Sequence, residues 1–221
     1  MHTLTVLRRA VVFLALLTIL TCAYTVIVTA AGKALFPFQV GGSIITINGK
    51  AYSTLLGQPF NAPNHLWGRP VSVDVSTYSA NSKPLLYAGP SNKSPATAEY
   101  AANLQTRLDH VRNAHPEKAG TPVPVDLVTE SASGLDPHIS PAAAEYQAER
   151  LARATGFTLV EVRRTIAMYT EGRTLGLLGE PRVNVLKVNL ALDGLLPSGR
   201  AASRDGGTSP QTGARATAVA R

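Results

Sequence analysis

The segment AVVFLALLTILTCAYTVIVTAAG fills residues 10–32, and none of its 23 residues carries a charge. A helix rises about 1.5 Å per residue, so this segment is long enough to cross a hydrocarbon core of about 30 Å. A cleaved signal peptide is the alternative, with Val28-Thr29-Ala30 as a small-residue cleavage site. The apolar core of a signal peptide is only about 7–15 residues long, however. We therefore predict an uncleaved transmembrane helix over 10–32, with Cys22 as an inert buried thiol.

The charges at the two ends of this segment predict its orientation. Arg8 and Arg9 precede it, whereas Lys33 is the only basic residue in the 16 residues that follow. Basic residues accumulate on the cytoplasmic side of a membrane. We therefore expect a single-pass protein with residues 1–9 in the cytoplasm and an extracytoplasmic domain over 33–193.

The net charge of +7 is concentrated at the ends of the chain. The region 33–193 has 15 basic and 13 acidic residues, which leaves only +2. A nucleic-acid binder concentrates positive charge on its folded part, so we expect no nucleic-acid partner. The tail 194–221 has four Arg, one Asp and almost no large apolar residue, and we expect it to be disordered.

The region 33–193 is predicted to be an α+β domain with about three helices and a small β-sheet. Asn48-Gly49 lies between two apolar runs, 43–48 and 51–56, and this pattern predicts a hairpin. Residues 123–128 alternate enough to predict a strand. A longer strand is predicted over 183–192, where apolar residues recur at every second position.

Capping signals predict the three helices. Ser94-Pro95 predicts a helix over about 95–113, because a serine cap followed by proline suits a helix start. Ser140-Pro141 repeats this signal and predicts a second helix, which Gly156 closes after about residue 155. Thr158, with Glu161 three residues later, forms a capping box and predicts a third helix that ends before Gly172.

The segment Asp136-Pro137-His138 is a candidate for metal binding or acid–base chemistry. One Asp and one His fall short of the three or four ligands that zinc requires, so we predict no metal site. An Asp two residues before a His is also a common turn arrangement with a purely structural role. A membrane-tethered extracytoplasmic hydrolase that uses Asp136, His138 and Glu171 remains the alternative functional hypothesis.

Two carboxylates and two guanidinium groups occur close together in a glycine-containing segment, at Glu171, Arg173, Glu180 and Arg182. Catalysis by either carboxylate would need a raised pKa in a dry pocket. We instead predict Arg–carboxylate ion pairs that fix the turns of this segment. The sequence also contains neither a Gly-x-Ser-x-Gly motif nor a phosphate-binding loop of the Walker type.

Two longer motifs resemble those of a known family. Residues 131–141 read SASGLDPHISP, and residues 179–193 read GEPRVNVLKVNLALD. Together with Thr170-Glu171-Gly172-Arg173 and three shorter pieces, they resemble KdpC, the C subunit of a bacterial potassium-transporting P-type ATPase complex, over residues 8–193. The shorter pieces are Gly57-Gln58-Pro59-Phe60, Gly68-Arg69-Pro70 and Gly89-Pro90-Ser91-Asn92. The chain departs from the family at Val71, because a Ser directly follows Gly-Arg-Pro in many members and Val71 intervenes here. It also departs at 83–87, which replaces a glycine-rich stretch.

The resemblance implies a non-catalytic accessory subunit for ATP-driven, high-affinity potassium uptake in a bacterial inner membrane. The implied partners are a potassium-selecting subunit and a P-type ATPase subunit, because this chain lacks both the Asp-Lys-Thr-Gly motif and a potassium filter. It further implies a catalytic chaperone that raises the affinity of the ATPase subunit for ATP. No firmly bound cofactor is expected, and ATP would be met through the ATPase subunit.

The resemblance names Ser133, Gly134 and Asp136 as candidate nucleotide contacts. The predicted orientation places these residues outside the membrane, away from cytoplasmic ATP. A role in capping and stabilising the assembly and a role in nucleotide contact therefore remain alternatives for the folded domain.

Overall fold

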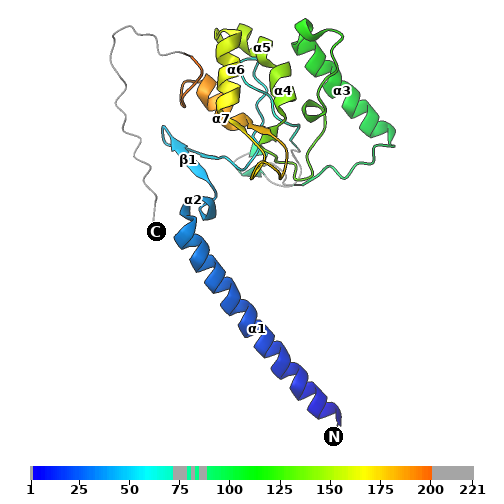
Figure 1. Cartoon of the computed structure of the whole chain (residues 1–221). Helices are drawn as coiled ribbons and strands as arrows, with labels where there is room; N and C mark the ends of the chain where they lie inside the picture. Colours follow the sequence, from blue (N-terminus) through cyan, green and yellow to red (C-terminus); the bar gives the residue numbers. More distant parts are fainter. Residues whose placement is uncertain (1, 72–78, 81–82, 85–88, 201–221) are drawn as a thin grey trace. The chain divides into compact units, whose positions relative to one another are not determined.

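The computed structural model describes residues 2–71, 79–80, 83–84 and 89–200 (Figure 1). The described chain forms two compact units, one up to Ile45 and one from Thr46 onward. The first unit contains the long helix α1 (His2–Leu35) and the single-turn helix α2 (Pro37–Val40). The second contains short helices and small sheets, so the predicted α+β class is confirmed.

Helix α1 is long and apolar enough to cross a membrane. An 18-residue window within Thr3–Leu35 has a mean hydropathy of 2.6, and none of this window is buried among the described residues. Thr18, Thr21 and Thr25 each donate a hydroxyl hydrogen bond of 2.8 Å to the carbonyl four residues earlier. These hydroxyls are therefore satisfied within the helix, as an apolar solvent requires.

The predicted hairpin is confirmed. Strands β1 (Ile44–Ile47) and β2 (Lys50–Ser53) form a two-stranded sheet. Both residues of the turn between them have positive φ, 51° at Asn48 and 76° at Gly49. Asn and Gly tolerate this conformation at little cost. A second small sheet pairs β3 (Ser79–Ala80) with β4 (Lys83–Pro84).

A three-stranded antiparallel sheet lies in the folded unit, in the order β5-β7-β6. Its strands are β5 (His138–Ile139), β6 (Thr170–Glu171) and β7 (Arg182–Asn184). The predicted strand over 183–192 is wrong, because β7 ends at Asn184 and helix α7 occupies Val185–Leu192. Asn184 begins this helix, and its side chain accepts a hydrogen bond from the Lys187 amide.

The other elements follow their capping signals in part. Helix α3 (Ala98–Ala114) begins at the cap Thr97 instead of Ser94. The predicted strand over 123–128 is wrong, because a 3-10 turn, η2 (Val125–Leu127), occupies it. Pro122 and Pro124 lack an amide hydrogen, so they cannot donate the backbone hydrogen bonds that a strand needs. A further 3-10 turn, η1 (Pro116–Lys118), follows α3.

The predicted second helix is divided at Gln147 into α4 (Pro141–Tyr146) and α5 (Ala148–Thr155). Gly156 closes α5 with a φ of 71°, as predicted. The capping box of Thr158 and Glu161 is confirmed at the start of α6 (Leu159–Met168).

The core lies where α4–α7 pack against the three-stranded sheet (Figure 1). Side chains without exposed surface come from several of these elements, among them Leu151, Val162, Val183 and Val188. The described start of the predicted tail, 194–200, also packs on this core. Tyr169 donates a hydrogen bond of 2.8 Å to the Pro197 carbonyl, and the Gly199 amide donates one of 2.8 Å to Thr165. The rest of the predicted tail lies outside the described residues.

Candidate functional site

The loop 131–137 contains the three candidate nucleotide contacts. Ser133 Oγ lies 3.2 Å from Ser131 Oγ and accepts a hydrogen bond of 3.2 Å from the Leu135 amide. Gly134 has a φ of 71°, and its amide donates to the Ser131 carbonyl at 3.2 Å. The hydroxyl of Ser133 thus fixes the turn that this loop makes.

Two glycines let the loop pack closely on neighbouring segments. A Cβ at Gly134 would clash with the carbonyl oxygen of Gly89. A Cβ at Gly57 would lie 2.7 Å from the Asp136 carbonyl oxygen, and the Gly57 amide donates a hydrogen bond of 2.7 Å to the Leu135 carbonyl. Backbone cannot move aside for a methyl group as a flexible side chain can, so this junction requires glycine at both positions.

Asp136 forms the turn that leads into β5. Its Oδ1 accepts a hydrogen bond of 3.0 Å from the His138 amide and lies 3.5 Å from His138 Nδ1, while Oδ2 lies 3.8 Å from Arg69 Nη1. The His138 side chain, then its amide and the nearby positive charges, lower the pKa of Asp136 below its usual value, against partial burial. Asp136 is therefore suited to remain ionised and fix the turn, not to act as a neutral acid.

Arg69 connects the loop to another motif. Its Nη2 donates a hydrogen bond of 2.8 Å to the Glu130 carbonyl, and its Nε donates one of 3.3 Å to the Thr129 carbonyl. Four of the segments that carry the resemblance meet around one small cavity, although they are far apart in the sequence. They are 57–60, 68–70, 131–141 and 179–193. The cavity is lined by Leu56, Gly57, Gln58, Phe60, Gly68, Arg69, Val71, Asp136, Pro137, Val185 and Leu186.

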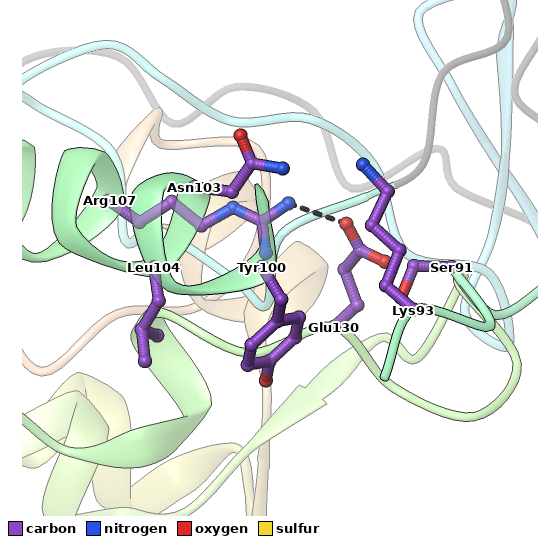
Figure 2. A pocket seen from close by; sticks show the side chains of 7 residues that line it. All are labelled: Ser91, Lys93, Tyr100, Asn103, Leu104, Arg107 and Glu130. Atoms are coloured by element: carbon purple, nitrogen blue, oxygen red, sulfur yellow. Dashed lines mark hydrogen bonds and ion pairs between the residues drawn. The ribbon is translucent and has the colours of Figure 1, made fainter. Parts of the chain in front are cut away.

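An open cleft lies beside the Ser131 turn, against the first half of α3. Figure 2 shows the smaller adjoining pocket, which shares five lining residues with this cleft: Ser91, Lys93, Tyr100, Arg107 and Glu130. The charged groups of the cleft are paired: Arg107 Nη2 contacts Glu130 Oε1, and Lys93 Nζ lies 2.7 Å from Glu99 Oε1. The cleft volume of about 240 Å³ is below the roughly 300–1,000 Å³ of typical small-molecule sites. It is lined by Pro90, Ser91, Lys93, Pro95, Tyr100, Arg107, Glu130, Ser131 and Ala132.

The three residues of the hydrolase hypothesis are not brought together. Asp136 and His138 are in contact, but Glu171 pairs with Arg182 at 2.8 Å and with Lys187 at 3.8 Å. Among the described residues, no group of three or more His, Cys, Asp or Glu side chains is placed to hold a metal ion.

The predicted Arg–carboxylate pairs are confirmed. Arg173 donates to both carboxylate oxygens of Glu180, at 2.8 and 2.7 Å, and Arg182 pairs with Glu171. The sheet explains this geometry, because Glu171 lies opposite Arg182 in the β6–β7 register.

Sequence reasoning missed a buried cation at Arg150. Its guanidinium lies 4.2 Å from the Trp67 ring and donates hydrogen bonds to Gln147 at 2.7 Å and to His115 Nε2 at 2.9 Å. It also contacts the carbonyls of Pro63 and His65. Burial lowers the pKa of Arg150 to about 10. The signal in the sequence that could have indicated a buried cation is the position of Arg150 between the apolar residues Ala148 and Leu151, which face the core with it.

Two side-chain amides hold the same extended segment. Asn189 accepts a hydrogen bond of 2.6 Å from the Leu66 amide and donates one of 2.9 Å to the Leu66 carbonyl. Gln147 does the same for Trp67, at 2.8 and 3.0 Å. These amides replace the backbone partners that a neighbouring strand would supply, so Leu66 and Trp67 are buried without being part of a sheet.

Comparison with known proteins identifies the family of this fold. Residues 6–194 match the family KdpC, described as "K+-transporting ATPase, c chain". The chain belongs to the KdpC family. The KdpC match begins within α1 and ends at Gly194, so it includes the loop 131–137, the cleft and the three-stranded sheet.

Curated KdpC proteins support the same assignment. The chain is 53% identical over 190 residues to the potassium-transporting ATPase KdpC subunit of Sorangium cellulosum (strain So ce56), which covers 85% of this chain and 97% of the relative. It is 50% identical over 194 residues to that of Polaromonas naphthalenivorans (strain CJ2), covering 87% and 96%. The subunit of Clostridium botulinum (strain Alaska E43 / Type E3) is 47% identical over 194 residues, covering 86% and 96%.

Proposed function

We propose that this chain is a non-catalytic accessory subunit of an ATP-driven potassium-uptake complex, which it stabilises from a bacterial cell membrane. Its partners are a potassium-selecting subunit and a P-type ATPase subunit. The observation that carries this proposal is the unburied apolar helix α1 in a member of the KdpC family. Because no part of this apolar stretch is buried among the described residues, it needs lipid or partner helices around it.

The proposal assigns the N-terminus to the cytoplasm and the folded domain to the outer side. Arg8 and Arg9 against Lys33 support this orientation. In that position the domain caps the potassium-selecting subunit. A reporter enzyme fused after residue 193 tests the orientation: phosphatase activity outside the cytoplasm supports the cap, and a cytoplasmic reporter overturns it.

One face of α1 supports helix–helix packing within the complex. Six small residues recur along it at alternating intervals of three and four, so they fall on one side of the helix. Small residues allow helix backbones to approach closely in lipid. They are Ala15, Thr18, Cys22, Thr25, Thr29 and Gly32.

Deletion of residues 1–33 tests assembly directly. The truncated chain should no longer co-purify with the two partner subunits. A second variant carries an unrelated apolar span of the same length in place of 10–32, which keeps the membrane tether. Loss of assembly in this variant also supports packing by α1 itself, whereas normal assembly of the deletion variant contradicts the proposal.

The alternative to the outer cap is a chaperone role that raises the ATP affinity of the ATPase subunit, with Ser133, Gly134 and Asp136 as nucleotide contacts on the cytoplasmic side. Its support is the membership of the chain in the KdpC family, since Lys93 and Arg107 in the nearby cleft are already paired with carboxylates. Labelling of the complex with a photoreactive ATP analogue tests this role in the variants Ser133→Ala and Asp136→Asn. Unchanged labelling contradicts nucleotide contact by these residues and leaves the capping role intact.

A further inference from the structure

The hairpin between β6 and β7 exposes a group of leucines. The side chains of Leu175, Leu177 and Leu178 belong to residues that are 87%, 80% and 63% exposed. Single exposed apolar residues are ordinary on protein surfaces, but three within four positions form a contiguous apolar tip. We call residues 174–178 the leucine tip.

Backbone hydrogen bonds fix the leucine tip. The Thr174 amide donates to the Leu178 carbonyl at 2.8 Å, and the Leu178 amide donates back at 2.9 Å. Leu175 and Gly176 both have positive φ, 55° and 73°. A leucine rarely adopts this conformation, since its Cβ crowds the backbone there. The surrounding contacts therefore hold Leu175 outward against its local preference.

Ion pairs support the base of the hairpin. Arg173 pairs with Glu180 at 2.7 Å, and Arg182 pairs with Glu171 at 2.8 Å. β7 continues directly into the buried helix α7, so the base is joined to the core. The tip is thus preorganised, and a partner would lose little conformational entropy in binding it.

The charges beside the tip distinguish between two kinds of occupant. A loop that inserts into an anionic bilayer is usually flanked by unpaired Lys or Arg and by Trp or Tyr. Here Arg173 pairs with Glu180, while Arg182 and Lys187 both pair with Glu171, and the segment 172–181 contains no aromatic residue. These paired charges and the lack of aromatic residues fit an apolar recess on a protein better than a lipid surface.

We propose that the leucine tip is a docking element that inserts into an apolar recess of another subunit of the same complex. The inference rests on the proposed function, because it names the contact surface of that accessory subunit. Burial of three leucines contributes through the hydrophobic effect, and the paired charges around them form a polar rim.

The test uses the full complex and the triple variant L175S/L177S/L178S. Affinity purification through a tagged ATPase subunit should recover this chain at about one tenth of the wild-type level or less. The matched control is V125S/V160S, which changes two apolar residues that are each 63% exposed elsewhere on the domain. The control should assemble normally.

A second variant separates docking from folding. Leu175→Gly removes an exposed side chain and relieves the positive φ, so the thermal midpoint of the purified chain should not fall. Its recovery in the complex should nevertheless decrease. Weak assembly with intact stability supports docking by the tip.

The remaining outcomes are separable. If the wild-type chain itself does not co-purify with the other subunits, the proposed function fails. If the wild-type chain assembles and the triple variant assembles equally well, the docking inference alone is overturned. It is also overturned if a photoreactive lipid labels the leucine tip in the assembled complex and the triple mutation removes that label without changing assembly, since lipid is then the occupant.

Discussion

Gly134 is the residue on which the loop 131–137 depends most directly. It needs both a positive φ of 71° and space beside the Gly89 carbonyl. Gly120 has a similar φ of 79° but nothing within 4 Å of an added Cβ. The pair therefore separates the cost of backbone conformation from the cost of close packing.

We predict that Gly134→Ala lowers the free energy of unfolding more than Gly120→Ala does. The Gly120 variant should lose only about 1–2 kcal/mol, the usual cost of a left-handed conformation for a residue with a Cβ. Chemical denaturation of the detergent-solubilised chain measures both. Equal losses would show that the Gly89 contact does not restrict this position.

His115 makes stability sensitive to mild acid. It is 1% exposed, its Nδ1 contacts the Val111 carbonyl at 2.6 Å, and its Nε2 accepts from Arg150. Burial, and then the charge of Arg150, lower the pKa of His115 below 6.5, although the Val111 carbonyl and Glu117 oppose this shift. The folded state therefore disfavours the imidazolium that forms in the unfolded state.

The sign of this effect follows from proton linkage. Above pH 6.5 His115 is neutral in both states, and its contacts contribute fully. As the pH falls below that value, the unfolded state takes up the proton first, so stability decreases. The variant His115→Gln should flatten this decrease in denaturation curves between about pH 6.5 and 5. The lowered pKa of Asp136 acts only below its usual value of 3.8, so it does not obscure this window.

At the scale of elements, helix α7 supplies the side-chain amide of Asn189 to the segment around Leu66, which is not paired with any of the described strands. Asn189 supplies both partners of Leu66, a residue with no exposed surface. We predict that Asn189→Leu destabilises the domain by about 2–4 kcal/mol, because two buried backbone groups lose their hydrogen bonds. Thermal unfolding followed by circular dichroism measures the change.

The exposed amide of Gln105 on α3 is the matched control for this prediction. Among the described residues, it bonds to the neighbouring side chain of Asp109 alone, at 2.8 Å. Gln105→Leu should therefore stay within about 0.5 kcal/mol of the wild type. A similar loss in both variants would mean that Asn189 acts through side-chain volume and not through its amide.

At the scale of the whole molecule, the folded unit extends past the last residue of the GEPRVNVLKVNLALD motif. The Pro197 carbonyl accepts a hydrogen bond from Tyr169 at the end of α6, and the Gly199 amide donates one to Thr165 within α6. The Arg200 guanidinium lies 4.0 Å from the Phe157 ring. We predict that truncation after Asp193 lowers the free energy of unfolding by about 1–3 kcal/mol. Truncation after Arg200 keeps these contacts and is the control. Equal stability of the two truncated chains in urea denaturation would contradict the prediction.

Local signals in the sequence predicted several elements correctly. The hairpin at Asn48-Gly49, the capping box at Thr158 and the Asp136 turn each depend on residues two or three positions apart. The same holds for the cap Gly156. Such contacts form within one turn of chain, so no knowledge of distant segments is needed to expect them.

The largest error, at 183–192, has a physical cause. Residues 185–192 are buried on nearly every side of α7, apart from the half-buried Lys187. Periodicity separates helix from strand only when one face is polar, and here both patterns fit the apolar residues. The Asn184 cap and the packing of α7 in the core decide for the helix.

The sequence by itself determined the apolar helix, the hairpin and the helix starts at Ser140 and Thr158, because each is encoded by neighbouring residues. Tertiary structure alone decided that Gly134 must face Gly89, that Arg150 is buried against Trp67, and that 194–200 packs on α6. These features join segments tens of residues apart, and their energies depend on burial and on backbone approach. Neither quantity exists until the chain has folded.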